Sequence, residues 1–157
     1  MPDQYAFITR WRFKAPLKEV WDAIYKTSEW PQWWKGVKAV KLIEKGDADD
    51  IGEVRAYTWR SALPYTLTFN MRMTHKEPMH LLRGEAFGEL EGVGLWQFEE
   101  KDGITRVQYN WDVKTIKPWM NNFSFILKPA FQYNHDVVMN WGAEGLSKKL
   151  NAELLKF

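Results

Sequence analysis

Residues 64–74, PYTLTFNMRMT, alternate strictly between apolar and polar side chains. The apolar face consists of Tyr65, Leu67, Phe69, Met71 and Met73. Successive side chains of a strand point to opposite faces, so this two-residue period predicts a half-buried β-strand. Comparable segments occur at 5–13, 37–47, 52–60, 80–90, 94–103 and 104–114. Because short turns separate most of them, we expect about seven strands in an antiparallel meander and no βαβ units.

Two glycine-containing segments mark turns between these strands. Asp102-Gly103 lies between two alternating runs and is a strong hairpin signal. Residues 84–94, GEAFGELEGVG, distribute their glycines over strands and a turn, which is not the arrangement of a phosphate-binding loop. We therefore interpret 84–94 as a hairpin with bulges.

Two short helices are expected after the first strand. In residues 15–25, Leu17, Val20, Trp21 and Ile24 follow the spacing of one helix face. The next segment, SEWPQWWKG, holds three tryptophans and ends at a glycine, which predicts a short second helix. Its tryptophans would anchor the helix over an apolar interior. A second interpretation places Trp34 at the entrance of a pocket.

The pattern becomes helical from Pro118 to the end of the chain, with a bend expected at Pro129. Residues 130–155 would then form one helix of roughly 39 Å, at about 1.5 Å per residue. One stripe of this helix should face the sheet: Phe131, His135, Val138, Gly142 and Leu146.

Gly142 and Gly145 each cost roughly 0.5–1 kcal/mol relative to alanine in a helix interior. Close contact with the sheet, or space left for a ligand, should offset that cost. His135 is a polar group on the inward stripe. It is either a core histidine bonded to a carbonyl or a Tyr hydroxyl, or a histidine that contacts a ligand. Asp136 lies about 100° round the helix, so a His–Asp dyad is not expected.

Composition excludes several classes of function. The 157 residues carry 22 basic and 20 acidic side chains, so a basic nucleic-acid-binding stripe has little support. There is no cysteine, and His75, His80 and His135 have no metal-ligand spacing. We find no export signal and no apolar run that would span a membrane. We expect one domain over residues 1–157, a cytoplasmic location, and no metal or other cofactor.

Five motifs occur in order along the chain. They are AP-x-x-x-VW at 15–21, W-x-x-WW-x-G at 30–36, G-x-x-x-W-x-F at 92–98, G-x-T-x-V at 103–107, and F-x-x-N-H-x-x-V-M-x-x-G-x-x-G-L at 131–146. In this order they resemble the SRPBCC superfamily, also called START-like or helix-grip, in its polyketide cyclase/dehydrase-like branch. The resemblance implies an α+β fold in which a curved antiparallel sheet grips the C-terminal helix and leaves a deep pocket.

Inward-facing residues of such a pocket are the candidate ligand contacts. They are Trp34, Tyr57, Trp59, Phe69, Met71, Arg83, Glu85, Trp96, Tyr109, Trp111, Phe131, His135 and Met139. Two strands stay ambiguous. In 52–60 the buried set is either Tyr57 and Trp59 or the alternate residues, and in 80–88 either Arg83 and Glu85 or the small residues between them face the cavity.

Three functions are compatible with these features. The first is binding of a hydrophobic small molecule, such as a lipid, a polyketide or an aromatic metabolite, as a carrier or sensor. The second is a metal-free cyclase or dehydratase, with His135 as acid or base and Arg83 or Tyr109 holding a carbonyl. The third is a protein-interaction module, for which the net charge of +2 and scattered lysines are the only support. We expect a monomer or homodimer without a nucleic-acid partner.

Overall fold

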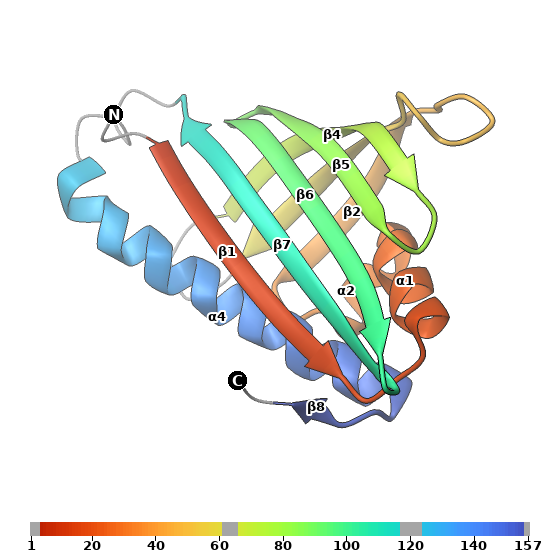
Figure 1. Cartoon of the computed structure of the whole chain (residues 1–157). Coiled ribbons are helices and arrows are strands. Elements are labelled where there is room, and N and C mark those ends of the chain that lie inside the picture. Colours follow the sequence, from red (N-terminus) through yellow and green to blue (C-terminus); the bar gives the residue numbers. More distant parts are fainter. Residues whose placement is uncertain (1–3, 61–65, 117–123, 156–157) are drawn as a thin grey trace.

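One curved antiparallel sheet wraps around a long C-terminal helix (Figure 1). The computed structural model describes residues 4–60, 66–116 and 124–155. The described strands have the spatial order β2-β3-β4-β5-β6-β7-β1-β8. Their bounds are β1 Gln4–Phe13, β2 Val37–Glu44, β3 Val54–Arg60, β4 Thr66–Glu77, β5 Leu81–Gly88, β6 Leu90–Lys101, β7 Ile104–Thr115 and β8 Leu154–Leu155. The described helical segments are α1 Leu17–Tyr25, the 3-10 turn η1 Thr27–Glu29, α2 Trp30–Trp33 and α4 Ser124–Leu150.

The predicted alternation is confirmed in the strands that face the helix. On β1, Tyr5, Phe7, Trp11 and Phe13 are buried, whereas the residues between them are at least partly exposed. The same alternation in β7 buries Trp111. Every second side chain of β1 and β7 therefore points into the interior of the protein, which explains how a short sequence period creates an aromatic interior.

The structure resolves the two ambiguous strands. On β3, Tyr57 is buried and Trp59 packs against the core, so these aromatic residues face inward. On β5, Leu82 and Ala86 are the buried residues. Arg83 lies between them in the sequence, and its side chain therefore belongs to the opposite face of the sheet.

Both predicted turns are present, with one correction. Asp102 and Gly103 have φ angles of 55° and 78°, as a tight hairpin turn between β6 and β7 requires. Residues 84–94 form the predicted hairpin between β5 and β6, but these two strands pair in continuous register. The register shifts occur instead in the β2–β3 and β4–β5 pairs.

The predicted bounds of the terminal helix are wrong at both ends. The helix α4 is continuous through Pro129, where proline removes one backbone hydrogen bond close to the helix start. It ends at Leu150, because Asn151 adopts a left-handed φ of 50°. The chain then turns back, and Leu154 pairs with Phe13 at the end of β1. Tyr65 and Pro118, which belong to the predicted strand and helix, lie outside the described residues.

Among the described residues, no helix has both the length and the apolar content required to cross a bilayer.

Candidate functional site

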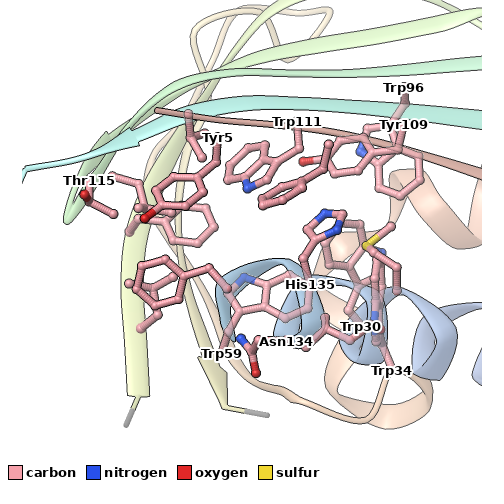
Figure 2. A pocket seen from close by; sticks show the side chains of 18 residues that line it. Tyr5, Trp30, Trp34, Trp59, Trp96, Tyr109, Trp111, Thr115, Asn134 and His135 are labelled. Atoms are coloured by element: carbon pink, nitrogen blue, oxygen red, sulfur yellow. The ribbon is translucent and has the colours of Figure 1, made fainter. Parts of the chain in front are cut away.

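The inner face of the sheet and α4 enclose a cavity of about 150 Å³, which we call the aromatic cavity. Figure 2 shows Tyr5 and Thr115 at one end, Trp96 and Tyr109 at the other, and His135 between them. The residues that line it are Tyr5, Phe7, Trp30, Trp34, Trp59, Leu67, Phe69, Leu90, Trp96, Tyr109, Trp111, Val113, Thr115, Phe131, Asn134, His135, Val138 and Met139.

The tryptophan-rich segment closes this cavity and fixes α4. Trp34 is 1% exposed, and its Nε1 donates a hydrogen bond of 2.8 Å to the Val138 carbonyl oxygen of α4. Its ring meets Trp59 edge to face with centroids 5.2 Å apart. Trp30 Nε1 donates to the Ile24 carbonyl oxygen at 3.2 Å, which ties α2 to α1. Trp34 thus both anchors α2 and lines the cavity.

The two glycines of α4 fit this contact. A Cβ at Gly142 would lie 2.5 Å from the Trp34 ring, and a Cβ at Gly145 would lie 1.8 Å from the Trp33 carbonyl oxygen. Of the two explanations expected for these glycines, close contact and space for a ligand, the structure shows close contact, which offsets the cost of glycine in a helix. The partner is α2, however, whereas we expected the sheet.

His135 reaches the cavity without a hydrogen-bond partner among the described residues. Its ring stacks on Phe7 at a centroid distance of 4.3 Å, and both ring nitrogens are buried and unpartnered within the described part of the chain. Asp136 Oδ1 is 4.0 Å from Nδ1 and accepts instead from Gln132 Nε2 at 2.9 Å. The expectation of no His–Asp dyad is met, and the interpretation of a hydrogen-bonded core histidine is not.

Burial determines the charge state of this histidine. Loss of hydration lowers the pKa of His135 to about 4, and the nearby Asp136 carboxylate opposes that shift only in part. The imidazole is therefore neutral near pH 7 and carries one N–H donor and one nitrogen acceptor. Trp59 Nε1 is a second buried donor at the cavity that has no partner among the described residues.

A second cavity of about 240 Å³, the polar chamber, lies beside the aromatic cavity. The two share Trp30, Trp59, Phe69, Trp96 and Tyr109 as lining residues. The polar chamber extends toward α1, η1 and the start of β3, where its lining includes Tyr25, Asp50, Glu53, Arg55 and Tyr57.

An inward-facing ion pair distinguishes the polar chamber. Arg55 Nε donates to Glu53 Oε1 at 2.6 Å, and its side chain is 23% exposed while that of Glu53 is 16% exposed. Burial lowers the pKa of Arg55, but the Glu53 hydrogen bond and charge outweigh this effect and leave the pKa raised. Burial also raises the pKa of Tyr57 to about 12, so its hydroxyl stays protonated at neutral pH.

The structure distributes the predicted ligand contacts over both cavities. Nine of the thirteen line the aromatic cavity: Trp34, Trp59, Phe69, Trp96, Tyr109, Trp111, Phe131, His135 and Met139. Tyr57 and Met71 line the polar chamber instead, and Arg83 borders it although its side chain belongs to the outer face of β5. Glu85 is absent from both linings, and its carboxylate contacts the Arg83 guanidinium at 3.3 Å. Both side chains lie on the face of β5 opposite Leu82 and Ala86, so the expected position of this pair over a ligand is corrected for both residues.

Several lining residues were not predicted, although the sequence contained a signal for them. Tyr5 and Phe7 lie on the inward face of the first alternating segment, and Asn134 is four residues from Val138 on α4. Glu53 and Arg55 share the parity of Tyr57, which places them inward as well. Among the described residues, no group of three His, Asp or Glu side chains could hold a metal ion.

Residues 13–132 match the sequence profile of the family described as polyketide cyclase/dehydrase and lipid transport. The chain belongs to this family. The match spans most of the chain, from the end of β1 into α4, and it agrees with the resemblance stated from the motifs. No curated protein is significantly similar in sequence.

Solved structures with the same fold are similar to this polyketide cyclase/dehydrase family member over nearly its whole length. The Zhui aromatase/cyclase from a Streptomyces species has a TM-score of 0.77 at 12% identity, with 94% of each chain covered. A protein from Thermus thermophilus has a TM-score of 0.74 at 13% identity, covering 92% of this chain and 99% of that one. A major latex-like protein of Panax ginseng reaches 0.62 at 11% identity, covering 86% and 98%. At these identities the likeness concerns the fold.

Proposed function

We propose that the protein binds an apolar, ring-bearing small molecule in the aromatic cavity and acts as its carrier or sensor. The observation that carries this proposal is a cavity of about 150 Å³ bordered by aromatic side chains, with unpartnered nitrogens of His135 and Trp59 among its described lining. An apolar cavity of about this volume stays dry and accepts a benzene-sized guest. Ligand sites are mostly apolar with a few placed polar groups, which is the chemistry found here.

Binding fits His135 better than acid–base catalysis does. A general base works best when its pKa lies near the operating pH. With a pKa of about 4, His135 is a weak base, and near pH 7 it lacks the second ring proton that a general acid would donate. As a neutral ring it can still recognise a carbonyl or hydroxyl group of a ligand.

A metal-free cyclase or dehydratase is the second candidate. It is supported by the family description, by the likeness to an aromatase/cyclase, and by the two unpartnered His135 nitrogens at the cavity. In this role His135 would move a proton while Tyr109 holds a carbonyl. Incubating the protein with a poly-β-ketone thioester tests this candidate: turnover by the wild type and its loss in His135→Gln, with the fold intact, would favour the enzyme.

Binding can be tested by titrating naphthalene and following tryptophan fluorescence. Val138→Phe adds a ring at the cavity wall, whereas Val137→Phe makes the same substitution at the neighbouring position of α4, outside both cavity linings. We expect the wild type and Val137→Phe to bind and Val138→Phe to bind at least tenfold more weakly. Circular dichroism of both variants controls for folding.

The proposal would be contradicted if the wild type bound neither naphthalene nor any other apolar probe. Equal binding by both folded phenylalanine variants would also contradict it, because it would place the probe outside the aromatic cavity. Solvent extraction of the purified protein followed by mass spectrometry gives an independent readout of a co-purified ligand.

A further inference from the structure

We infer that the ligand is an elongated, uncharged molecule whose ring system fills the aromatic cavity and whose oxygen-bearing end lies in the polar chamber. This inference rests on the proposed binding function and specifies the class of ligand. It distinguishes neutral oxygenated molecules from carboxylates such as fatty acids.

The sizes of the two cavities indicate that one ligand extends over both. The two cavities have volumes of about 150 and 240 Å³. Sites for drug-sized ligands measure about 300–1,000 Å³, so each cavity alone is small for such a molecule. Five aromatic residues line both cavities, so the two cavities adjoin. A ligand that extends past these residues can occupy both cavities. Figure 2 places Trp96 and Tyr109, which are among them, at the end of the aromatic cavity farthest from Thr115.

The aromatic cavity disfavours a charged ligand. Its described lining contains no Lys, Arg, Asp or Glu. Moving a carboxylate from water into such surroundings is costly unless a cation compensates it, whereas a neutral ring gains from burial. The His135 ring is neutral near pH 7 and supplies no compensating charge.

The charge of Arg55 in the polar chamber is already balanced by Glu53. Arg55 contacts Glu53 through both Nε and one terminal nitrogen, at 2.6 and 3.4 Å. A second carboxylate, Asp50, accepts a hydrogen bond from the Tyr25 hydroxyl, to which Lys76 donates at 3.3 Å. Lys26 is at the chamber's rim but is exposed, where water and salt screen its charge. Arg83 also borders the chamber, but its guanidinium contacts the Glu85 carboxylate at 3.3 Å.

The same groups suit a neutral oxygen acceptor. A guanidinium has five N–H donors, and the Glu53 contacts use two of those of Arg55. The Tyr57 hydroxyl, kept protonated by burial, lies in the same lining. A buried ion pair is weak evidence for stability, because desolvation offsets much of its attraction. An inward Arg55–Glu53 pair therefore fits a role in positioning donors without adding net positive charge.

The experiment compares three probes of one shape: biphenyl, biphenyl-4-carboxamide and biphenyl-4-carboxylate. Affinities are measured by calorimetry at pH 7.5 for the wild type, Glu53→Gln and Glu99→Gln. Glu53→Gln leaves the Arg55 charge unbalanced. Glu99→Gln makes the same change on an exposed carboxylate, 71% accessible, that lines neither cavity.

We expect the wild type to bind the carboxamide at least tenfold more tightly than the carboxylate. Glu53→Gln should reduce that preference by about tenfold, because the Arg55 charge becomes available to the carboxylate, and Glu99→Gln should not change it. If biphenyl binds but the carboxylate binds as tightly as the carboxamide, or if Glu53→Gln leaves the preference unchanged, the inference is wrong while the proposed function stands. If none of the three probes binds the wild type, the proposed function itself fails.

Discussion

Gly142→Ala tests how closely α2 and α4 pack. Helix propensity alone favours alanine over glycine by about 0.5–1 kcal/mol. The structure opposes this gain, because a Cβ at position 142 would lie 2.5, 2.7 and 2.8 Å from the Cε2, Cζ2 and Nε1 atoms of Trp34. That ring is 1% exposed and donates to the Val138 carbonyl oxygen at 2.8 Å, so it has little room to move.

The expected loss can be estimated from these contacts. Overpacking a filled core costs about 1–3 kcal/mol. Displacing the indole weakens a hydrogen bond whose net contribution is about 0.5–1.5 kcal/mol. After the propensity gain is subtracted, Gly142→Ala should destabilise the fold by about 1–3 kcal/mol. For a chain of this size, a loss of about 2 kcal/mol lowers the Tm by about 4–8 °C.

Urea unfolding followed by circular dichroism measures this change. Asn140→Ala is the matched control, because Asn140 is exposed on the same helix and feels propensity without the clash. It should be as stable as the wild type or slightly more stable. Gly142→Ala should also cost less in a Trp34→Phe background, since the smaller ring leaves room for the methyl group. If Gly142→Ala were as stable as Asn140→Ala, the close contact between Trp34 and α4 would be refuted.

Three further changes test other parts of the account. The pKa of His135 is about 4 in the folded protein, compared with an ordinary value of 6.5. Between pH 6.5 and pH 4 the unfolded chain therefore binds one proton more than the folded protein, so the free energy of unfolding falls as the pH drops through this range. The loss should total about 3 kcal/mol in the wild type. Unfolding of His135→Phe at several pH values should lack this loss, and a variant with the same pH profile as the wild type would contradict the buried neutral ring. Trp34→Phe removes the hydrogen bond to Val138 and leaves a void, so chemical unfolding should show a free energy of unfolding lower by about 2–4 kcal/mol. A decrease below about 0.5 kcal/mol would argue against the anchoring role of Trp34. Thr105 is fully buried and donates to the Ala15 carbonyl oxygen at 2.7 Å; Thr105→Val should cost about 1–3 kcal/mol in the same assay, and a neutral result would mean that water replaces the bond.

Local patterns predicted most of the sheet because each pattern reports on its own strand. Alternation correctly predicted which side of β1 and β4 faces inward, and Asp102-Gly103 correctly predicted the β6–β7 turn. The two-residue strand β8 could not be predicted, because it is stabilised by pairing with the end of β1, which is distant in the sequence. The C-terminal end of α4 could not be predicted either, because the helix ends at an asparagine with a left-handed φ and no Gly or Pro marks this position.

In the candidate site, too, local patterns predicted some features, whereas others depend on tertiary packing. Aromatic residues on inward faces could be predicted from parity, and most of them line the aromatic cavity. The Arg55–Glu53 pair shares that parity, but charged residues on an inward face contradict the usual reading of alternation and were missed. Whether Gly142 faces the sheet, a ligand or α2 depends on tertiary packing that no local pattern encodes.

The central claim is that the space between the sheet and α4 receives a guest molecule. A crystal soaked with 4-bromobiphenyl tests it directly, because the bromine gives an anomalous signal that locates the probe. We predict ordered density in the aromatic cavity, with the probe's rings beside Phe7 and His135. Side chains that fill this space, with the bromine signal confined to the protein surface, would contradict the account.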